Sequence, residues 1–448
     1  MSTLPRFMIS AAHKSSGKTV LSTGLAGALN AAGDQVSTFK KGPDYIDPMW
    51  LGAASGRPCY NLDFFTMQRE EIQAFFASRA GPLSLIEATK GLFDGVQTDG
   101  SDSNAELAKL LGLPVILVID TTGMTRGIAP LLAGYESFDP EVNIAGLILN
   151  RVGGARHEGK LRNAVEAYSD LPVLGSVWRD SRMDIGERHL GLTPPAELSH
   201  ISDLISGFSE TVAKSVDLDA IRAIAQSAPD MYKPEKPAAQ TCTKRSKLKI
   251  GILKDAAFGF YYPDDLEAFE ACGASLVPID ATRDMDLPQI DGLFIGGGFP
   301  ECRMNALSSN QKFRNALLQH LENGLPCYAE CGGMMYLCEH LSWEDHTRPM
   351  VGLIKAGALM HAKPQGRGYV TFFCSNDHPW GSGGQTLRGH EFHYASIEGL
   401  PEDTRFARKV LRGHGVDGQN DAIVVANTVA GFCHLRNTAH SPWVPRFF

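Results

Sequence analysis

The sequence predicts an α/β fold built as two tandem α/β domains. Its 448 residues exceed one ordinary domain core and favour two or three domains. Short runs rich in Val, Ile and Leu alternate with helix-length segments, the pattern of a parallel sheet covered by helices. This alternation stops in a Pro- and Lys-rich stretch, which we interpret as a linker over residues 229–247. We therefore expect one domain over residues 1–228 and another over residues 248–448.

The first domain begins with a strand over residues 6–12, RFMISAA, and a helix over residues 19–33 that ends at glycine. Further strands are expected at 35–40, 83–88, 114–120, 144–150 and 171–177. Because these runs are apolar on both sides, they indicate a parallel sheet with helices on both faces.

A second β/α series begins at residues 247–255. A helix is expected next, and strands then lead to LPCYAECGG. Later β-like segments have shorter connections and lie at 368–374, 387–398 and 421–435. The second domain is therefore predicted to be α/β with a β-rich end.

Composition excludes several classes of protein. The net charge is −8 and there is no basic tail, so a nucleic-acid partner is not expected. We find neither a signal peptide nor an apolar stretch of membrane-spanning length. The nine cysteines are scattered without a C-x-x-C pair, which favours reduced thiols in the cytoplasm. We expect a cytoplasmic protein without a membrane partner, and a homodimer stays open.

The segment AAHKSSGKT resembles a phosphate-binding loop, because it follows a strand and opens a helix. Gly17 would let backbone N–H groups wrap phosphate oxygens at the helix N-terminus. Lys18 would reach the β- and γ-phosphates, and the Thr19 hydroxyl would bind Mg²⁺. Ala12 replaces the usual first glycine, and the alternative is a helix cap beside a surface lysine. The strand–loop–helix context favours nucleotide binding.

Acidic residues follow the next predicted strands. Asp44 and Asp47 lie in the loop FKKGPDYIDP, Glu87 ends a strand, and Asp94 lies in the loop beyond it. Ligands of open α/β sheets bind at the carboxyl ends of strands, so we expect these acids and Lys40 to converge near a metal and phosphates. Taken singly, each acid is better explained as a turn former or helix cap, and the functional interpretation depends on their occurrence together after successive strands.

The segment CYAECGGMMYL places Cys331 at a turn from strand to helix. A helix N-terminus favours thiolate, and the glycines permit the strained turn of a nucleophile elbow. His434, at the end of a late strand, is the candidate base. Gly297 and Gly298 could donate N–H groups to an oxyanion. The alternative is a buried structural cysteine.

With both segments in view, the chain resembles the cobyrinic acid a,c-diamide synthase family almost end to end. The motifs that carry the resemblance are GPDYIDP, GLFDG, LILNRVGG, ERHLGL, AECGGMMYL and RGHEFHY. The family implies an ATP-dependent synthetase domain, similar to dethiobiotin synthetase, joined to a class I glutamine amidotransferase domain without a full triad. It implies Mg²⁺, with ATP as co-substrate, and glutamine and a tetrapyrrole polycarboxylate as partners. ATP would convert a carboxylate to an acyl phosphate, and Cys331 would release ammonia from glutamine.

The resemblance also implies roles for individual residues. The nucleotide would contact Gly17, Lys18, Thr19, Lys40 and Asn150. The metal would contact Thr19, Asp44 and Glu87. The tetrapyrrole or its activated carboxylate would lie near Tyr45, Asp47, Asp94, Arg188 and His189.

The chain departs from the family pattern in several places. Lys90 and Lys41 add cations near the acceptor site, and His434 is followed by Leu435 and Arg436. No glutamate lies two residues after His434, so the base must be oriented in another way. The first interpretation is amidation of the a and c acetates of a cobyrinate-type ring. The alternatives are a siroheme or sirohydrochlorin-type amidase and, from another class, a regulatory ATPase with a thiol domain that only binds.

Overall fold

The chain folds into two compact units. Unit 1 comprises Met1–Phe64 and Arg69–Pro237, and unit 2 comprises Phe65–Gln68 and Ala238–Phe448. The computed structural model describes residues 4–188, 191–195, 200–231, 247–381 and 383–447. Most of the predicted linker, residues 232–246, lies outside the described residues.

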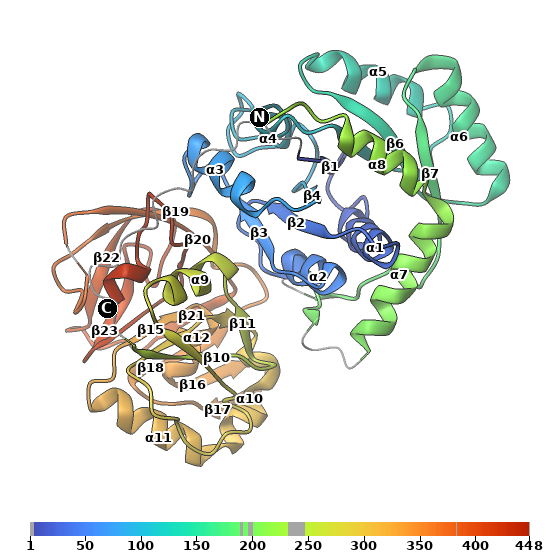
Figure 1. Ribbon diagram of the computed structural model, residues 1–448. Helices are drawn as coiled ribbons and strands as arrows, with labels where there is room; N and C mark the ends of the chain where they lie inside the picture. The colour runs from blue at the N-terminus through green and yellow to red at the C-terminus, as the bar shows by residue number, and fades with distance from the viewer. Residues whose placement is uncertain (1–3, 189–190, 196–199, 232–246, 382, 448) are drawn as a thin grey trace. The chain divides into compact units, whose positions relative to one another are not determined.

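Unit 1 is built on a seven-stranded sheet in which all neighbouring pairs are parallel (Figure 1). Its order across the sheet is β3 (Cys59–Leu62), β2 (Val36–Lys41), β4 (Leu83–Glu87), β1 (Arg6–Ala11), β5 (Val115–Asp120), β6 (Ile144–Val152) and β7 (Val173–Trp178). Six of these strands match predicted ones. The edge strand β3 was not predicted, because four residues after a proline carry little periodicity.

Helices cover the sheet because its strands are apolar on both sides. Phe7 and Ile9 of β1 pack in one core with Leu25 and Val212 from two of the covering helices. Met8, between Phe7 and Ile9, therefore faces the other side of the sheet. The helices of unit 1 are α1 (Lys18–Ala31), α2 (Ile46–Ser55), α3 (Arg69–Arg79), α4 (Asn104–Leu111), α5 (Ile128–Phe138), α6 (Ala155–Tyr168), α7 (Ile201–Ser215) and α8 (Leu218–Gln226). A small ladder joins β8 (Glu187–Arg188) and β9 (Gly191–Leu192).

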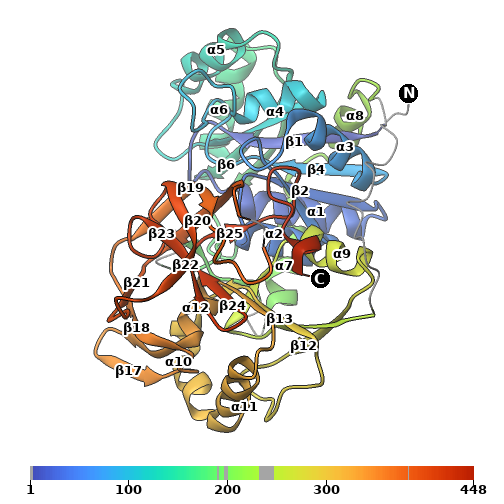
Figure 2. The same cartoon turned by 90° about the vertical axis from the view of Figure 1, so that its left-hand side faces the viewer.

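Unit 2 is built on a ten-stranded mixed sheet (Figure 2). One half is parallel, in the order β12 (Ser275–Ile279), β10 (Lys249–Leu253), β13 (Gly292–Ile295), β15 (Cys327–Glu330) and β24 (Thr428–Gly431). The antiparallel half continues with β23 (Asn420–Val425), β22 (Arg405–Arg412), β19 (Gly366–Cys374), β20 (Thr386–His393) and β25 (His434–Leu435). The α/β class predicted for both units is confirmed.

Both faces of this sheet are buried. Leu293 and Ile295 pack in one core and Phe294, between them, in the other. The covering helices are α9 (Pro263–Ala271), α10 (Pro300–Ser309), α11 (Gln311–Glu322) and α12 (Gly332–Leu337), with the 3-10 helix η2 (Val444–Phe447). Smaller sheets contain β16 (Cys338–Trp343), β17 (His346–Pro349), β18 (Ile354–Met360), β21 (Ala395–Glu398), and β11 (Phe258–Phe260) with β14 (Gly297–Gly298).

Three observations bear on the expectations from composition. Within the described part of the chain, no helix combines the length and the apolar content needed to cross a bilayer. The free thiols are Cys59, Cys302, Cys327, Cys331, Cys338, Cys374 and Cys433. Six of these seven are buried, and Cys302 is half-buried.

Candidate active sites

The loop between β1 and α1 has the backbone of an anion cradle. Ser15 and Gly17 both have left-handed conformations, with φ of 64° and 81°, and alternation of this kind turns successive N–H groups toward one side. A Cβ on Gly17 would lie 2.4 Å from Asn150 Nδ2. That amide donates to the Ser16 carbonyl at 2.8 Å. Glycine is therefore required here, and Asn150 braces the loop.

Two buried lysines lie beside this loop in different electrostatic surroundings. Lys40 Nζ donates to Asp47 Oδ2 and Glu87 Oε1, both at 2.6 Å. Burial would lower the pKa of Lys40, but these two carboxylates outweigh it and raise the pKa. Lys18 Nζ donates to the Lys90 carbonyl at 2.5 Å. Burial and Lys40 lower the pKa of Lys18 to about 8. Glu87, Asp47 and Asp94 offset these two effects only in part, and a polyphosphate would add further negative charge.

Glu87 and Thr19 offer oxygen ligands to a cation. The Thr19 hydroxyl donates to Glu87 Oε1 at 3.0 Å. The other carboxylate oxygen, Glu87 Oε2, is buried and has no hydrogen-bond partner among the described residues. Burial raises the pKa of Glu87, so a cation at Oε2 would favour the ionised form. The described residues hold no cluster of three or more His, Cys, Asp or Glu side chains suited to a metal. The arrangement fits Mg²⁺, which takes few protein ligands beside phosphate and water.

The two aspartates after β2 lie at the start of α2. Asp44 Oδ1 accepts from the backbone N–H groups of Ile46 at 2.9 Å and Asp47 at 3.2 Å, so it caps this helix. Burial and the Asp47 charge raise the pKa of Asp44 to about 7. Burial would also raise the pKa of Asp47, but Lys40 outweighs it and lowers that pKa. Tyr45 is buried at the helix start.

Among the described residues, the hydrogen bonds of the remaining acceptor-site candidates do not link them to the lysines or to Glu87. Asp94 Oδ2 accepts from the Gly91 N–H at 2.8 Å, so it closes the turn of its own loop. Arg188 lies in β8, and His189 lies outside the described residues. Hydrogen bonds thus bring together Lys40, Asp47, Glu87 and Thr19. Lys18 donates instead to the Lys90 carbonyl, and the acceptor-facing roles stay predictions.

In unit 2, Cys331 joins β15 to α12 with φ of 49° and ψ of −107°. A non-glycine residue rarely adopts this conformation, which here projects the side chain from a sharp turn. The Cys331 N–H donates to the Gly431 carbonyl at 2.7 Å, holding the turn against β24. A Cβ on Gly332 would lie 3.0 Å from the Gly298 carbonyl oxygen. The elbow therefore packs against the glycine-rich strand β14.

His434 is held between a thiol and a carboxylate. Its Nδ1 lies 3.2 Å from Glu330 Oε2, and Glu330 Oε1 accepts from the Leu435 N–H at 2.8 Å. Burial alone would lower the pKa of His434, but hydrogen bonds to Cys331 and Glu330 outweigh it and raise the pKa to about 10. All three side chains are buried. This arrangement stabilises the imidazolium form of His434.

Glu330 is the functional candidate that the sequence reasoning missed. It occupies the orienting position that no glutamate near His434 could fill, and it directly precedes Cys331. Its position in the sequence could have identified it, because Glu330 is an acidic residue at the end of the fully buried strand β15. A charge is rarely buried there without a partner.

The predicted oxyanion glycines lie beside the same residues. A Cβ on Gly297 would lie 2.7 Å from His434 Cε1, so a larger residue would displace the imidazole. A second histidine also covers the base: the His390 ring stacks on His434 with centroids 4.9 Å apart. Burial and His434 hold the pKa of His390 well below its ordinary value. A neutral ring therefore packs on the charged one.

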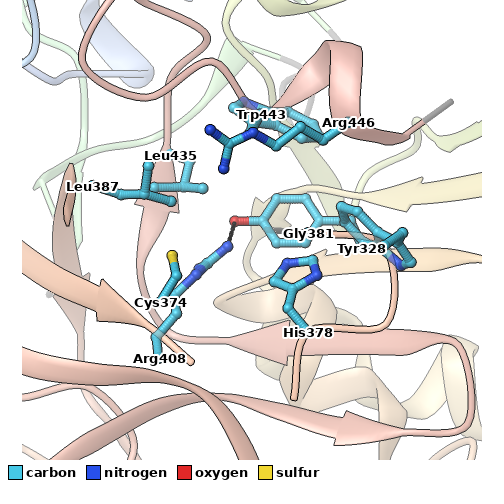
Figure 3. Close-up of a pocket in the computed structure, with 10 residues that line it drawn as sticks. Tyr328, Cys374, His378, Gly381, Leu387, Arg408, Leu435, Trp443 and Arg446 are labelled. Carbon is cyan, nitrogen blue, oxygen red and sulfur yellow. Dashed lines mark hydrogen bonds between the residues drawn. The ribbon is translucent and has the colours of Figure 1, made fainter. Parts of the chain in front are cut away.

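A separate cavity in unit 2 is lined by none of Cys331, His434 and Glu330 (Figure 3). It has a volume of about 10 Å³ and is lined by Tyr328, Cys374, His378, Trp380, Gly381, Leu387, Arg408, Leu435, Trp443 and Arg446. Arg408 Nη2 donates to the Tyr328 hydroxyl at 3.2 Å across it. That volume accommodates about one water molecule, so this cavity is not an acceptor site.

Comparison with known proteins agrees with this geometry. Residues 7–192 match the CobQ/CobB/MinD/ParA nucleotide binding domain, and residues 249–441 match the CobB/CobQ-like glutamine amidotransferase domain. Cobyrinate a,c-diamide synthase of Magnetococcus marinus is 41% identical, with 99% of this chain and 96% of that protein covered. The synthase of Methanosarcina acetivorans is 38% identical, with 98% and 93% covered.

Among solved structures, PurLQS from Thermotoga maritima overlaps 45% of this chain and 96% of that chain, with a TM-score of 0.37 and 16% identity. This likeness is too low to add to the assignment. The full-length relatives and the two domain matches are sufficient. The chain belongs to the cobyrinate a,c-diamide synthase family, and it joins a nucleotide-binding domain to a glutamine amidotransferase domain as a glutamine-dependent ligase.

Proposed function

We propose that the protein amidates the a and c acetate carboxylates of a cobyrinate-type tetrapyrrole, using ATP and glutamine. Unit 1 would convert each carboxylate to an acyl phosphate, and ammonia from glutamine would replace the phosphate. The observation that carries this proposal is the Cys331–His434–Glu330 site in a chain that also holds the cradle at Gly17. The acceptor is the one proposed because the relatives are cobyrinate a,c-diamide synthases.

Ammonia release in unit 2 follows from the three side chains. The Cys331 thiolate attacks the side-chain carbonyl carbon of glutamine, and the carbonyl oxygen becomes an oxyanion near Gly297 and Gly298. The His434 imidazolium gives its proton to the departing nitrogen, and ammonia leaves. Water then attacks the glutamyl thioester, which releases glutamate and restores the thiolate. Glu330 holds the proton on Nδ1, so that Nε2 serves the sulfur.

Carboxylate activation in unit 1 follows from the cradle and the lysines. The acceptor carboxylate oxygen attacks the γ-phosphorus of ATP, and ADP leaves. Backbone N–H groups near Gly17, together with Lys18 and Lys40, offset the charge on the phosphates. Thr19, Glu87 and Asp44 are proposed to hold Mg²⁺, which would neutralise phosphate charge when bound. Ammonia then attacks the acyl carbon and phosphate departs.

A siroheme or sirohydrochlorin-type ring is the second candidate acceptor. It is favoured by the additional cation at Lys90, which is exposed on a backbone with φ of 59° directly after the Glu87 strand. Lys41 does not contribute in the same way, because it is buried. The two candidates differ in the ring and share the chemistry of the carboxylate.

The test is to incubate the purified chain with ATP, Mg²⁺, glutamine and each candidate ring, and to weigh the products. Two replacements of a carboxyl OH by NH₂ on cobyrinate, dependent on ATP, are the expected result. Amidation of only the siroheme-type ring would transfer the proposal to the second acceptor. No amide on either ring, with glutamine or with ammonium, would refute it.

A further inference from the structure

A four-residue segment from the first half of the sequence, Phe65–Gln68, belongs to unit 2. Its first residue is held on several sides. The Phe65 ring stacks on Tyr369 with centroids 4.4 Å apart at 18°. The guanidinium carbons of Arg388 and Arg412 lie 5.3 Å and 5.5 Å from the Phe65 ring centroid. Arg388 Nη1 also donates to the Phe65 carbonyl at 3.2 Å. Stacking and cation–π contacts of this kind fix a ring in place.

The next two residues are buried and hydrogen-bonded. The Thr66 carbonyl accepts from the Thr438 hydroxyl at 2.7 Å. Arg436 Nη1 lies 3.3 Å from Met67 Sδ. Thr66 is 3% exposed and Met67 is 2% exposed. The segment is therefore an integral part of unit 2 and not a loose surface loop.

Arg436 connects this segment to the catalytic base. It lies two residues after His434, and its Nε donates to Asp264 Oδ2 at 2.8 Å. Its guanidinium carbon lies 5.2 Å from the Tyr262 ring centroid. The Tyr262 hydroxyl lies 3.4 Å from Nδ1 of His390, the ring that stacks on His434. A displacement of Arg436 would reach the base through the chain and through these rings.

The other end of the segment continues into the phosphate site of unit 1. Strand β3 pairs with β2 so that Asn61 lies opposite Lys40. Asn61 Nδ2 donates at 2.8 Å to the carbonyls of Gly42 and Asp44. The chain from Asn61 to Phe65 is therefore anchored on the loop that carries Asp44.

We propose that the Phe65–Gln68 segment couples the phosphate site to the glutaminase base, with Arg436 as the positioning residue. The inference rests on the proposed function and specifies its regulation. When ATP and acceptor fill the site beside Asp44, a shift of that loop is carried along the anchored chain to Phe65, and Arg436 moves the His434 strand into its reactive position. Glutamine hydrolysis is then slow without acceptor and fast with it, by roughly 5- to 150-fold, the usual range of coupling between two sites.

The first test measures ammonia release from glutamine by the full chain, alone and with ATP, Mg²⁺ and cobyrinate. Phe65→Ala removes the stack and both cation–π contacts, so its stimulation should vanish while amidation with ammonium is retained. Phe64→Ala is the matched control, because this adjacent phenylalanine contacts Arg69 within unit 1. That variant should keep the stimulation. A Phe65→Ala protein stimulated like the unmodified chain would overturn the proposal.

A milder variant guards against misfolding of Phe65→Ala. Thr438→Val removes only the hydroxyl that donates to the Thr66 carbonyl, so it should reduce the stimulation and leave ammonium-dependent amidation intact. Unchanged stimulation in this variant would contradict the coupling. Failure of the proposed function looks different, because the unmodified chain would then form no amide. If that chain forms amides but its glutaminase ignores ATP and acceptor, only the coupling is refuted.

Discussion

At each site a residue with positive φ stands directly before a helix that follows a strand. At the phosphate site this residue is Gly17, with φ of 81°, and at the glutaminase site it is Cys331, with φ of 49°. Gly17 has no room for a side chain, because Asn150 fills the space. Cys331 instead uses the turn to present its sulfur. The two residues differ in ψ, which is 20° at Gly17 and −107° at Cys331. A positive φ before a helix thus makes a cradle where the side chain is absent and a nucleophile where it is present.

The two sites also differ in how the pKa values of their buried groups are displaced. The phosphate site buries several charges whose pKa values are displaced, with Lys18 lowered to about 8 and Asp44 raised to about 7. The glutaminase site has one imidazole whose pKa its neighbours raise to about 10. A polyphosphate would add negative charge beside Lys18 in the first site, whereas in the second site Cys331 and Glu330 already outweigh burial at His434.

The largest effect is expected for Cys331→Ala, which should abolish the use of glutamine without affecting the use of ammonium. Cys331→Ala should lower glutamine-dependent amidation on the order of 10⁴-fold or more, because the nucleophile is lost. Amidation with ammonium should be unchanged. Cys374→Ala, a buried cysteine outside the site, is the control and should keep both activities. Both rates are measured by mass spectrometry of the products, and loss of both in Cys331→Ala would contradict separate sites.

Glu330→Gln tests whether the carboxylate orients the base. The amide keeps the shape but favours the wrong imidazole tautomer, so glutamine hydrolysis should fall by roughly 10²- to 10⁴-fold. Glu330 raises the pKa of His434, and the imidazolium is lost as pH rises through that value. The alkaline limb of the pH–rate profile should therefore move to lower pH in the variant. An unshifted limb would remove Glu330 from the mechanism.

Lys18→Ala tests the phosphate site of unit 1. Because the lysine offsets phosphate charge, amidation should fall by about 10²-fold or more with either nitrogen source. Basal glutamine hydrolysis should persist. Lys14→Ala changes an exposed lysine of the same loop and should leave amidation intact. Appreciable amidation by Lys18→Ala would refute the assignment of the loop.

Gly17→Ala tests the phosphate loop, and Gly33→Ala, at a second glycine with positive φ, is its control. Both Gly17 and Gly33 have positive φ, but a Cβ on Gly33 would meet nothing within 4 Å. Alanine at either position adds strain of about 1–2 kcal/mol. Only Gly17→Ala also displaces Asn150, so only it should raise the KM for ATP, by about 10-fold or 1.4 kcal/mol. Equal KM values in the two variants would show that the close packing is unimportant.

The sheet of unit 1 was predictable because its strands are continuous apolar runs, and the phosphate loop because its residues are contiguous. The role of Glu330 was not predictable, because Glu330 lies 104 residues from His434 in the sequence. Strand alternation shows that an acid is buried and does not show what it faces. The Phe65–Gln68 segment carries no periodicity, and its contacts come from residues more than three hundred positions later. Only the folded chain reveals such pairings.

The backbone conformation of Cys331 has a consequence for how this position would evolve. A side chain held at φ of 49° and ψ of −107° is strained by about 1–3 kcal/mol. Glycine would relax that turn, so a chain with Cys331→Gly should unfold at a higher temperature than the working enzyme. Descendants released from selection for glutamine use would therefore drift toward glycine at this position, and such a replacement would mark a lineage fed by free ammonia.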